Sequence, residues 1–164
     1  MTKQLQDAYV VAAKRTPIGK VRGAFRNVRP DDLLVHAIRA ALAEVPQLDP
    51  ATIEDAIVGC AMPEGEQGFN VARIATLLAG LPDTVGGVTI NRFCASGITA
   101  VQMAADRIRV GEADVMIAAG TESMSMVPMG GSRPSFNPEI FAASNEHVGI
   151  AYGMGMTAEK VAQQ

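Results

Sequence analysis

The sequence predicts an α/β fold, with a mostly parallel sheet covered by helices on both faces. Continuous apolar runs alternate at least three times with amphipathic helical patterns, which is typical of βαβ units. The runs have no polar face, as expected for strands that are buried on both sides of a sheet. The composition is 48% hydrophobic but only 4% aromatic, which favours close packing of small side chains in a domain of ordinary size.

Turn residues divide the first 120 residues into individual elements. Strands are expected at four apolar runs, residues 8–13, 53–60, 85–93 and 114–119. Helices are expected at residues 30–45, 70–79 and 96–109. Residues 63–68, PEGEQG, predict a flexible polar loop. Helical spacing predicts that the apolar residues of the last two helices face the core, namely Val71, Ile74, Leu78, Ile98, Val101, Ala105 and Ile108.

The character of the sequence changes after Gly120. Residues 122–139, ESMSMVPMGGSRPSFNPE, contain three Met and three Pro without a regular period, which indicates an extended loop or the start of an inserted subdomain. We therefore expect two domains, residues 1–120 and 121–164. The chain ends in MTAEKVAQQ, inside a predicted helix, so the second domain is expected to be truncated.

Charge and cysteine usage limit the partners and the compartment. The net charge is −3 and the pI is near 5.4; with Lys and Arg spread along the chain, nucleic acid is not expected as a partner. The apolar run near the N-terminus is too short for a signal peptide or a membrane span, so we expect no membrane partner. The two cysteines, Cys60 and Cys94, have no CxxC spacing. This argues against a disulfide framework or a metal site and favours a reducing, cytoplasmic compartment.

Cys94 lies in the segment INRFCASGITAV, residues 90–101, between a predicted strand and a predicted helix. Open α/β sheets bind their ligands at this end of the strands. The first N–H groups of a helix and its dipole stabilise a thiolate or a developing oxyanion, and small neighbouring residues let a substrate approach the backbone. These features suggest a nucleophile; the alternative is a small buried thiol, the usual state of an unpaired cysteine.

Four other residues are of types that can act as catalytic groups. His36 is expected on the solvent side of its helix, and His147 in an irregular segment with nothing to direct it toward Cys94. Cys60 ends a buried strand and is expected in the core. Glu122 follows the fourth strand, where a loop or helix cap is the commoner role.

Residues 153–158, GMGMTA, satisfy the pattern G-x-G-x-x-A after a short apolar run. Alone, this pattern suggests dinucleotide binding. The fingerprint also needs an acidic residue about 20 positions further on, beyond the last residue of this sequence. It is therefore a weak alternative.

The cysteine segment carries a resemblance to a known family. Residues 90–97, INRFCASG, are similar to the nucleophile segment of the thiolases, the acetyl-CoA acyltransferases that cleave or form 3-oxoacyl-CoA. Matches of the same kind flank it in order along the chain: RTPIGKVRGAF, EGEQGFNVARIATLLAGLP, GTESMSMVPM and YGMGMTAEKVA. The resemblance implies a thiolase-like N-terminal half followed by the start of a loop domain.

The resemblance also implies a chemistry for named residues. Cys94 matches the nucleophile that takes up the acyl group as a thioester, and its N–H matches one donor of an oxyanion hole. Met154 matches a methionine that lines the acyl pocket. Gly153 stands where biosynthetic members often carry His, which favours the degradative, β-oxidation type. Coenzyme A is then a co-substrate, with no covalently bound cofactor and no metal.

The match covers only the first half of a thiolase. The family's histidine that activates the nucleophile, and its second cysteine, which serves as acid and base, lie in the other half. Two interpretations stay open. In one, the function belongs to a complete enzyme, with a homo-oligomer or a complementing chain as partner. In the other, the chain is an inactive fragment that acts at most as a dimerisation or interaction module.

Overall fold

The computed structural model describes residues 5–142 and 147–164. They form two compact units, one ending at Ser132 and the other comprising Arg133–Gln164. The predicted domain boundary between residues 120 and 121 concerns the family's domains and stays a prediction. No helix in the described parts of the chain is long and apolar enough to cross a membrane.

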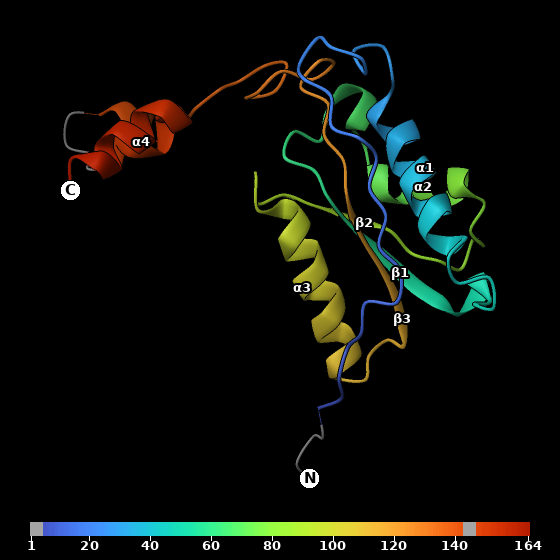
Figure 1. The fold of residues 1–164 in the computed structure, drawn as a ribbon. Helices are drawn as coiled ribbons and strands as arrows, with labels where there is room; N and C mark the ends of the chain where they lie inside the picture. Colours follow the sequence, from blue (N-terminus) through green and yellow to red (C-terminus); the bar gives the residue numbers. More distant parts are fainter. Residues whose placement is uncertain (1–4, 143–146) are drawn as a thin grey trace. The chain divides into compact units, whose positions relative to one another are not determined.

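The first unit is built on a parallel sheet of three strands in the order β2-β1-β3 (Figure 1). The central strand β1 (Ile53–Gly59) pairs with β2 (Val88–Ile90) on one side and with β3 (Val115–Gly120) on the other. Gly59 is in register with Ile90 and with Gly120. The carboxyl ends of the three strands therefore lie at the same edge, and the predicted parallel α/β sheet is confirmed.

Helices cover both faces of this sheet. α1 (Pro30–Leu42) and α2 (Val71–Ala79) lie on one face, and α3 (Ser96–Arg109) lies on the other (Figure 1). A hydrophobic core lies on each face of the sheet, and neighbouring residues of β1 contribute to opposite cores. Val58 packs with α1 and α2, whereas Ile57 packs with α3. The predicted helices are confirmed, although α1 ends at Leu42 and not at residue 45.

α2 begins and ends where the sequence predicts. The Asn70 side chain accepts a hydrogen bond from the N–H of Arg73, and Gly80 closes the helix in the left-handed conformation, with φ of 89°. Both are common end signals, because a side-chain oxygen satisfies an unpaired N–H and glycine adopts positive φ without strain.

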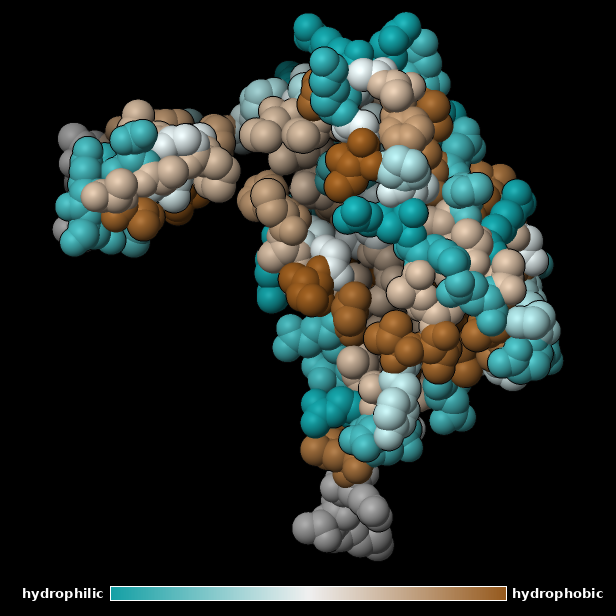
Figure 2. Space-filling model, in the orientation of Figure 1, coloured by the Kyte–Doolittle hydropathy of each residue, from teal (hydrophilic) through white to brown (hydrophobic). Residues whose placement is uncertain are grey.

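The predicted core face of α3 was wrong, and that of α2 is confirmed only at Val71, which is 1% exposed. α3 buries the small residues Ser96, Ala100 and Ala104, while Ile98 and Val101 are 68% and 43% exposed. α2 buries Ala72, Ala75 and Thr76 beside Val71 and leaves Leu78 exposed. Small side chains let a helix approach a strand closely, so the face of least volume is the one that packs. Figure 2 shows the resulting apolar surface over α3 and the N-terminal run.

The predicted strand at residues 8–13 was also wrong. This run is extended but forms no strand, and Tyr9, Val10 and Val11 are exposed. The run is not part of the sheet, and together with residues of α1, α3 and β3 it lines a cavity of about 470 Å³. The run is held at its start, where the backbone N–H of Gln6 donates to the Arg109 carbonyl at 3.0 Å.

The remaining elements are short. Helical turns of the 3₁₀ type occupy Pro50–Thr52, Gly65–Gln67, Pro138–Phe141 and Val148–Ala151. The second unit ends in α4 (Met154–Ala162). A dinucleotide fingerprint requires a strand and a loop before its helix. Here a 3₁₀ turn, and not a strand, precedes the GMGMTA motif, and the motif lies within α4 from Met154 onward. This geometry contradicts the dinucleotide-binding alternative.

Candidate active site at the carboxyl edge of the sheet

Cys94 lies in a tight turn between β2 and α3, where two polar side chains fix the backbone. Asn91 Oδ1 accepts the Phe93 N–H at 2.8 Å, while Asn91 Nδ2 donates to the Ala61 carbonyl at 2.9 Å. Ser96 Oγ accepts the Arg92 N–H at 2.8 Å and donates to the Phe93 carbonyl at 2.6 Å. The residues on both sides of Cys94 are thus tied to the turn and to the loop after β1.

The same side chains explain why the third predicted strand ends early. It was expected over residues 85–93, but β2 begins only at Val88 and ends at Ile90. Asn and Ser side chains that bond to nearby backbone groups compete with the sheet ladder. Phe93 then adopts φ of 47°, a left-handed conformation that costs a bulky residue free energy and persists only where its surroundings enforce it.

α3 begins directly against the end of β1. A Cβ atom added to Gly59 would lie 2.5 Å from the Ser96 carbonyl carbon and 2.6 Å from the Gly97 nitrogen. Real Cβ atoms do not come this close to backbone, so only glycine permits the contact. The contact places the first turn of α3, and with it Cys94, at the carboxyl edge of the sheet.

The Cys94 thiol is free and exposed, which contradicts the buried alternative, while its role as a nucleophile stays a prediction. The expectation that the neighbouring N–H groups point at a ligand is contradicted for Ala95 and Ser96. Ala95 N–H and Ser96 N–H bond to the carbonyls of Arg92 and Phe93 at 3.1 and 3.0 Å, so they do not face a ligand. An exposed thiol on a rigid turn before a helix can attack an electrophilic carbonyl.

Cys60, the other cysteine, is in the core as predicted, with 1% of its surface exposed. Burial and the nearby charge of Glu122 raise the pKa of the Cys60 thiol to about 11, since both disfavour a thiolate. Cys60 Sγ lies 4.0 Å from Glu122 Oε1. A thiol held neutral in this way is a poor nucleophile.

Glu122 joins two loops at this edge, the capping role expected of it. Its Oε2 accepts the Ala61 N–H at 2.6 Å, and its Oε1 accepts a hydrogen bond from Gln67 Nε2. The fully buried Gln67 also donates to the Met62 carbonyl at 2.8 Å and accepts the Ser123 N–H at 2.9 Å. The loop at residues 63–68, predicted to be flexible, therefore contains the main polar anchor of the site.

We expect Gln67→Leu to lower the free energy of unfolding by about 3 kcal/mol, because it keeps the volume but leaves buried backbone groups without partners. Urea denaturation measures this change. Gln102→Leu, at an exposed position of α3, is the matched control, for which a change within about 0.5 kcal/mol is expected. Equal losses in the two variants would contradict the anchoring role of Gln67.

The remaining candidates lie on α1 and in the second unit. His36 is exposed on α1, as predicted. His147 and Met154 belong to the second unit, where Met154 begins α4 and is 65% exposed, so its place in an acyl pocket stays a prediction. Within residues 5–142 and 147–164, no three His, Cys, Asp or Glu side chains are close enough together to hold a metal ion.

A feature missed by the sequence reasoning is a basic loop, defined as residues 14–29. It contains six of the 14 Lys and Arg and no acidic residue, so the cations are less evenly spread than the whole-chain composition implies. The net charge calculated in a sliding window of about 16 residues identifies this basic loop from the sequence. Its backbone joins the carboxyl edge of the sheet, because Arg22 N–H donates to Ser125 Oγ at 2.8 Å.

Comparisons with known proteins identify relatives of this chain. The sequence-family model for the thiolase N-terminal domain matches residues 8–164. A 3-ketoacyl-CoA thiolase of Colwellia psychrerythraea is 41% identical over 162 residues, which are 98% of this chain and 41% of that protein. A 3-oxoadipyl-CoA/3-oxo-5,6-dehydrosuberyl-CoA thiolase of Escherichia coli is 47% identical over 135 residues, 81% of this chain and 34% of that protein.

A solved structure shares the fold. The acetyl-CoA acetyltransferase of Bacillus anthracis is 34% identical, with a TM-score of 0.72 over 83% of this chain and 36% of that one. The chain spans about two fifths of the length of the curated relatives it matches. From the matched domain and the shared fold, the chain belongs to the thiolase family, of which it comprises the N-terminal domain region.

Proposed function

We propose that this chain is the nucleophile-bearing part of a thiolase that transfers acyl groups between coenzyme A thioesters. The observation that carries the proposal is the exposed Cys94 thiol on a rigid, strained turn before α3, in a chain of the thiolase family. The relatives named above act, by their names, on 3-ketoacyl-CoA or related 3-oxo thioesters. We therefore propose 3-oxoacyl-CoA and free coenzyme A as substrates.

In the proposed reaction, the Cys94 thiolate attacks the 3-oxo carbonyl carbon of the substrate. The bond between carbons 2 and 3 breaks, its electron pair goes to carbon 2, and protonation there releases acetyl-CoA. The shortened acyl group remains on Sγ as a thioester until the thiol of a second coenzyme A displaces it. Reversal of these steps condenses two acyl-CoA molecules.

The roles of individual residues follow from this scheme as part of the proposal. The Cys94 N–H donates to the oxyanion that forms on the attacked carbonyl, and Met154 lines the acyl pocket. Residues 121–164 are the beginning of the loop domain. The groups that activate the thiol belong to the remaining part of a complete enzyme or to a partner chain, in a reducing, cytoplasmic compartment.

A second candidate is an interaction module without catalysis. The observation that favours it is the apolar surface of α3, where Ile98, Val101 and Met103 are exposed. Apolar patches of this kind mark surfaces that associate. Such a module would form a dimer or bind a complementing chain, and it would leave Cys94 unacylated.

Intact-mass spectrometry after brief exposure to acetyl-CoA or acetoacetyl-CoA tests the proposal. We expect one acyl adduct on the wild-type chain and on Cys60→Ala, and none on Cys94→Ala. The two cysteine variants are matched controls, because each removes one thiol. An acyl adduct that is still found in Cys94→Ala contradicts acyl transfer through Cys94. A wild-type chain without an adduct also contradicts it and favours the interaction module.

A further inference from the structure

The basic loop concentrates positive charge in a protein that is otherwise acidic. Residues 14–29 contain six Lys and Arg and no acidic residue, whereas the rest of the chain has eight Lys and Arg against 17 Asp and Glu. Near an extended anionic surface, a chain with this asymmetry is oriented with the loop toward the surface and the acidic remainder away from it.

Two of the six cations are neutralised by acids. Lys14 pairs with Glu44, and Arg29 pairs with Asp31 at 2.8 Å. The other four are exposed and form no ion pair with any acidic side chain in the described ranges, namely Arg15, Lys20, Arg22 and Arg26. Their charge is available to an anionic surface.

Two exposed apolar side chains lie among these cations in the chain. Ile18 is 80% exposed and Val21 is 48% exposed, and they stand on either side of Lys20 in the sequence. Binding a small soluble anion does not require exposed apolar side chains. A surface that combines basic and apolar side chains is typical of proteins that bind the interface of a membrane.

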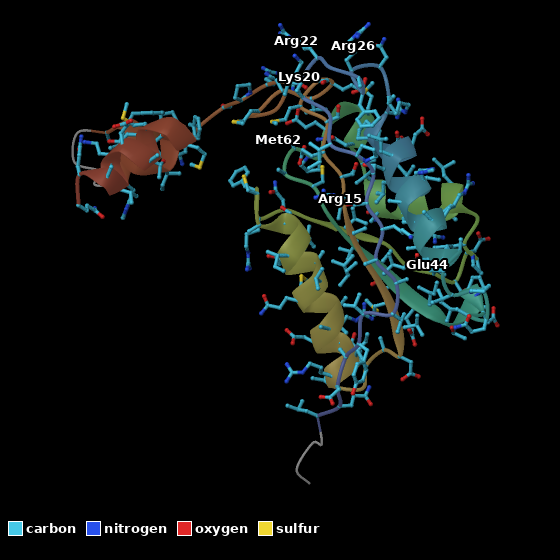
Figure 3. All side chains as sticks on the ribbon, in the orientation of Figure 1. Arg15, Lys20, Arg22, Arg26, Glu44 and Met62 are labelled. Carbon is cyan, nitrogen blue, oxygen red and sulfur yellow. The ribbon has the colours of Figure 1, made fainter. Side chains whose placement is uncertain are left out.

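The loop presents these side chains from an ordered backbone. The Gly23 N–H donates to the Lys20 carbonyl at 2.9 Å, and the Arg26 N–H donates to the Gly23 carbonyl at 3.1 Å. The Arg22 N–H donates to Ser125 Oγ at a point where Arg22 adopts φ of 58°. Figure 3 shows Lys20, Arg22 and Arg26 together on this loop. Because these contacts fix the backbone, binding costs less ordering entropy than it would on a mobile tail.

We propose that the basic loop attaches this chain to the surface of a bilayer that contains anionic lipid. The cations bind lipid phosphates, while Ile18 and Val21 enter the boundary between the headgroups and the acyl chains. This attachment needs neither a signal peptide nor a membrane span, the two features on which the expectation of no membrane partner rests. The inference goes beyond the proposed function and does not depend on it.

The side chains of the loop favour a bilayer over nucleic acid, the other extended anionic surface. Proteins that bind single-stranded nucleic acid usually stack its bases on aromatic side chains. Phe25 is the only aromatic residue of the loop. It is half-buried and packs over Gly19, where an added Cβ would lie 2.9 Å from the ring. The exposed side chains, Ile18 and Val21, are aliphatic and suit acyl chains.

Vesicle flotation tests the attachment, because bound protein rises with the vesicles and aggregated protein does not. We expect the chain to float with vesicles of mixed phosphatidylglycerol and phosphatidylcholine and to stay behind with phosphatidylcholine alone. Each cation near an anionic surface contributes about fivefold to binding, so the variant Lys20→Gln/Arg22→Gln/Arg26→Gln should bind about 100-fold more weakly. Added salt should weaken the binding of the wild type as well.

Two controls separate the loop from the rest of the chain. Arg109→Gln/Arg133→Gln/Lys160→Gln removes the same charge at exposed positions outside the loop, and its binding should change less than about fivefold. Ile18→Ser should weaken binding about fivefold by removing apolar contact. Val161→Ser, at a position that is 65% exposed in α4, should leave binding unchanged.

Several outcomes overturn the inference. They are absent binding, equal binding to the two kinds of vesicle, and equal losses in the loop variant and its charge control. Unchanged binding in Ile18→Ser also overturns it, because the attachment then lacks its apolar part. Tighter binding to a single-stranded oligonucleotide than to the anionic vesicles would assign the loop to nucleic acid instead.

Discussion

We expect Gly59→Ala to lower the free energy of unfolding by at least about 3 kcal/mol, because the new methyl group would overlap backbone atoms that cannot rotate away. The added Cβ meets the Ser96 carbonyl carbon at 2.5 Å and the Gly97 nitrogen at 2.6 Å. Relief requires α3 to move away from β1, which would also displace Cys94. Chemical denaturation followed by circular dichroism measures the loss of stability.

Gly97→Ala is the matched control, since Gly97 lies on the other side of the same contact and nothing lies within 4 Å of its added Cβ. Alanine in the first turn of α3 should stabilise the helix by up to about 1 kcal/mol. A loss of less than 1 kcal/mol in Gly59→Ala, or losses of similar size in both variants, would show that the close approach of α3 to β1 does not constrain the fold.

The two thiols should differ at least about 100-fold in their rate of alkylation by iodoacetamide at pH 8. Cys94 is exposed, whereas Cys60 is 1% exposed and its pKa is raised to about 11. At pH 8, such a buried thiol is ionised in only about one molecule in a thousand. Peptide mass spectrometry at timed intervals measures both rates. In urea, which unfolds the chain, the two rates should converge; similar rates in the native state would contradict the buried placement of Cys60.

The same shift makes stability depend on pH. The pKa of Cys60 rises from an ordinary value of 9.0 to about 11 in the folded chain. Between these values the unfolded chain loses the proton while the folded chain keeps it, so the free energy of unfolding decreases as pH rises from 9 to 11. Denaturation midpoints across this range measure the effect. In Cys60→Ala the decrease should be smaller, and an identical slope would exclude Cys60 as its cause.

Elements defined by strong local signals could be predicted from the sequence. α3 occupies residues 96–109 as predicted, and Asn70 and Gly80 bound α2. The choice of buried face could not be predicted in the same way, because it depends on how closely each helix approaches the sheet. Ala100 and Ala104 pack where Ile98 and Val101 were expected, since burial follows the available space as well as hydrophobicity.

In the candidate site, too, features encoded by neighbouring residues could be predicted, whereas contacts between residues distant in the chain could not. The place of Cys94 before a helix is a local pattern, and it was predicted. The anchor made by Gln67 and Glu122 joins positions 55 residues apart in the chain, so no local window contains it. The strand expected at residues 8–13 failed for a related reason, because a run becomes a strand only where a neighbouring edge lies within hydrogen-bonding distance.

The small-residue face of α3 makes the position of the thiol independent of side-chain conformation. The helix rests on the sheet through Ala100 and Ala104, and its first turn touches Gly59. Alanine and glycine have no rotamers to exchange, so no rotation of these side chains can shift the helix. The outer residues of α3 can therefore change, during evolution or in the laboratory, while the backbone of the Cys94 turn keeps its location on the sheet.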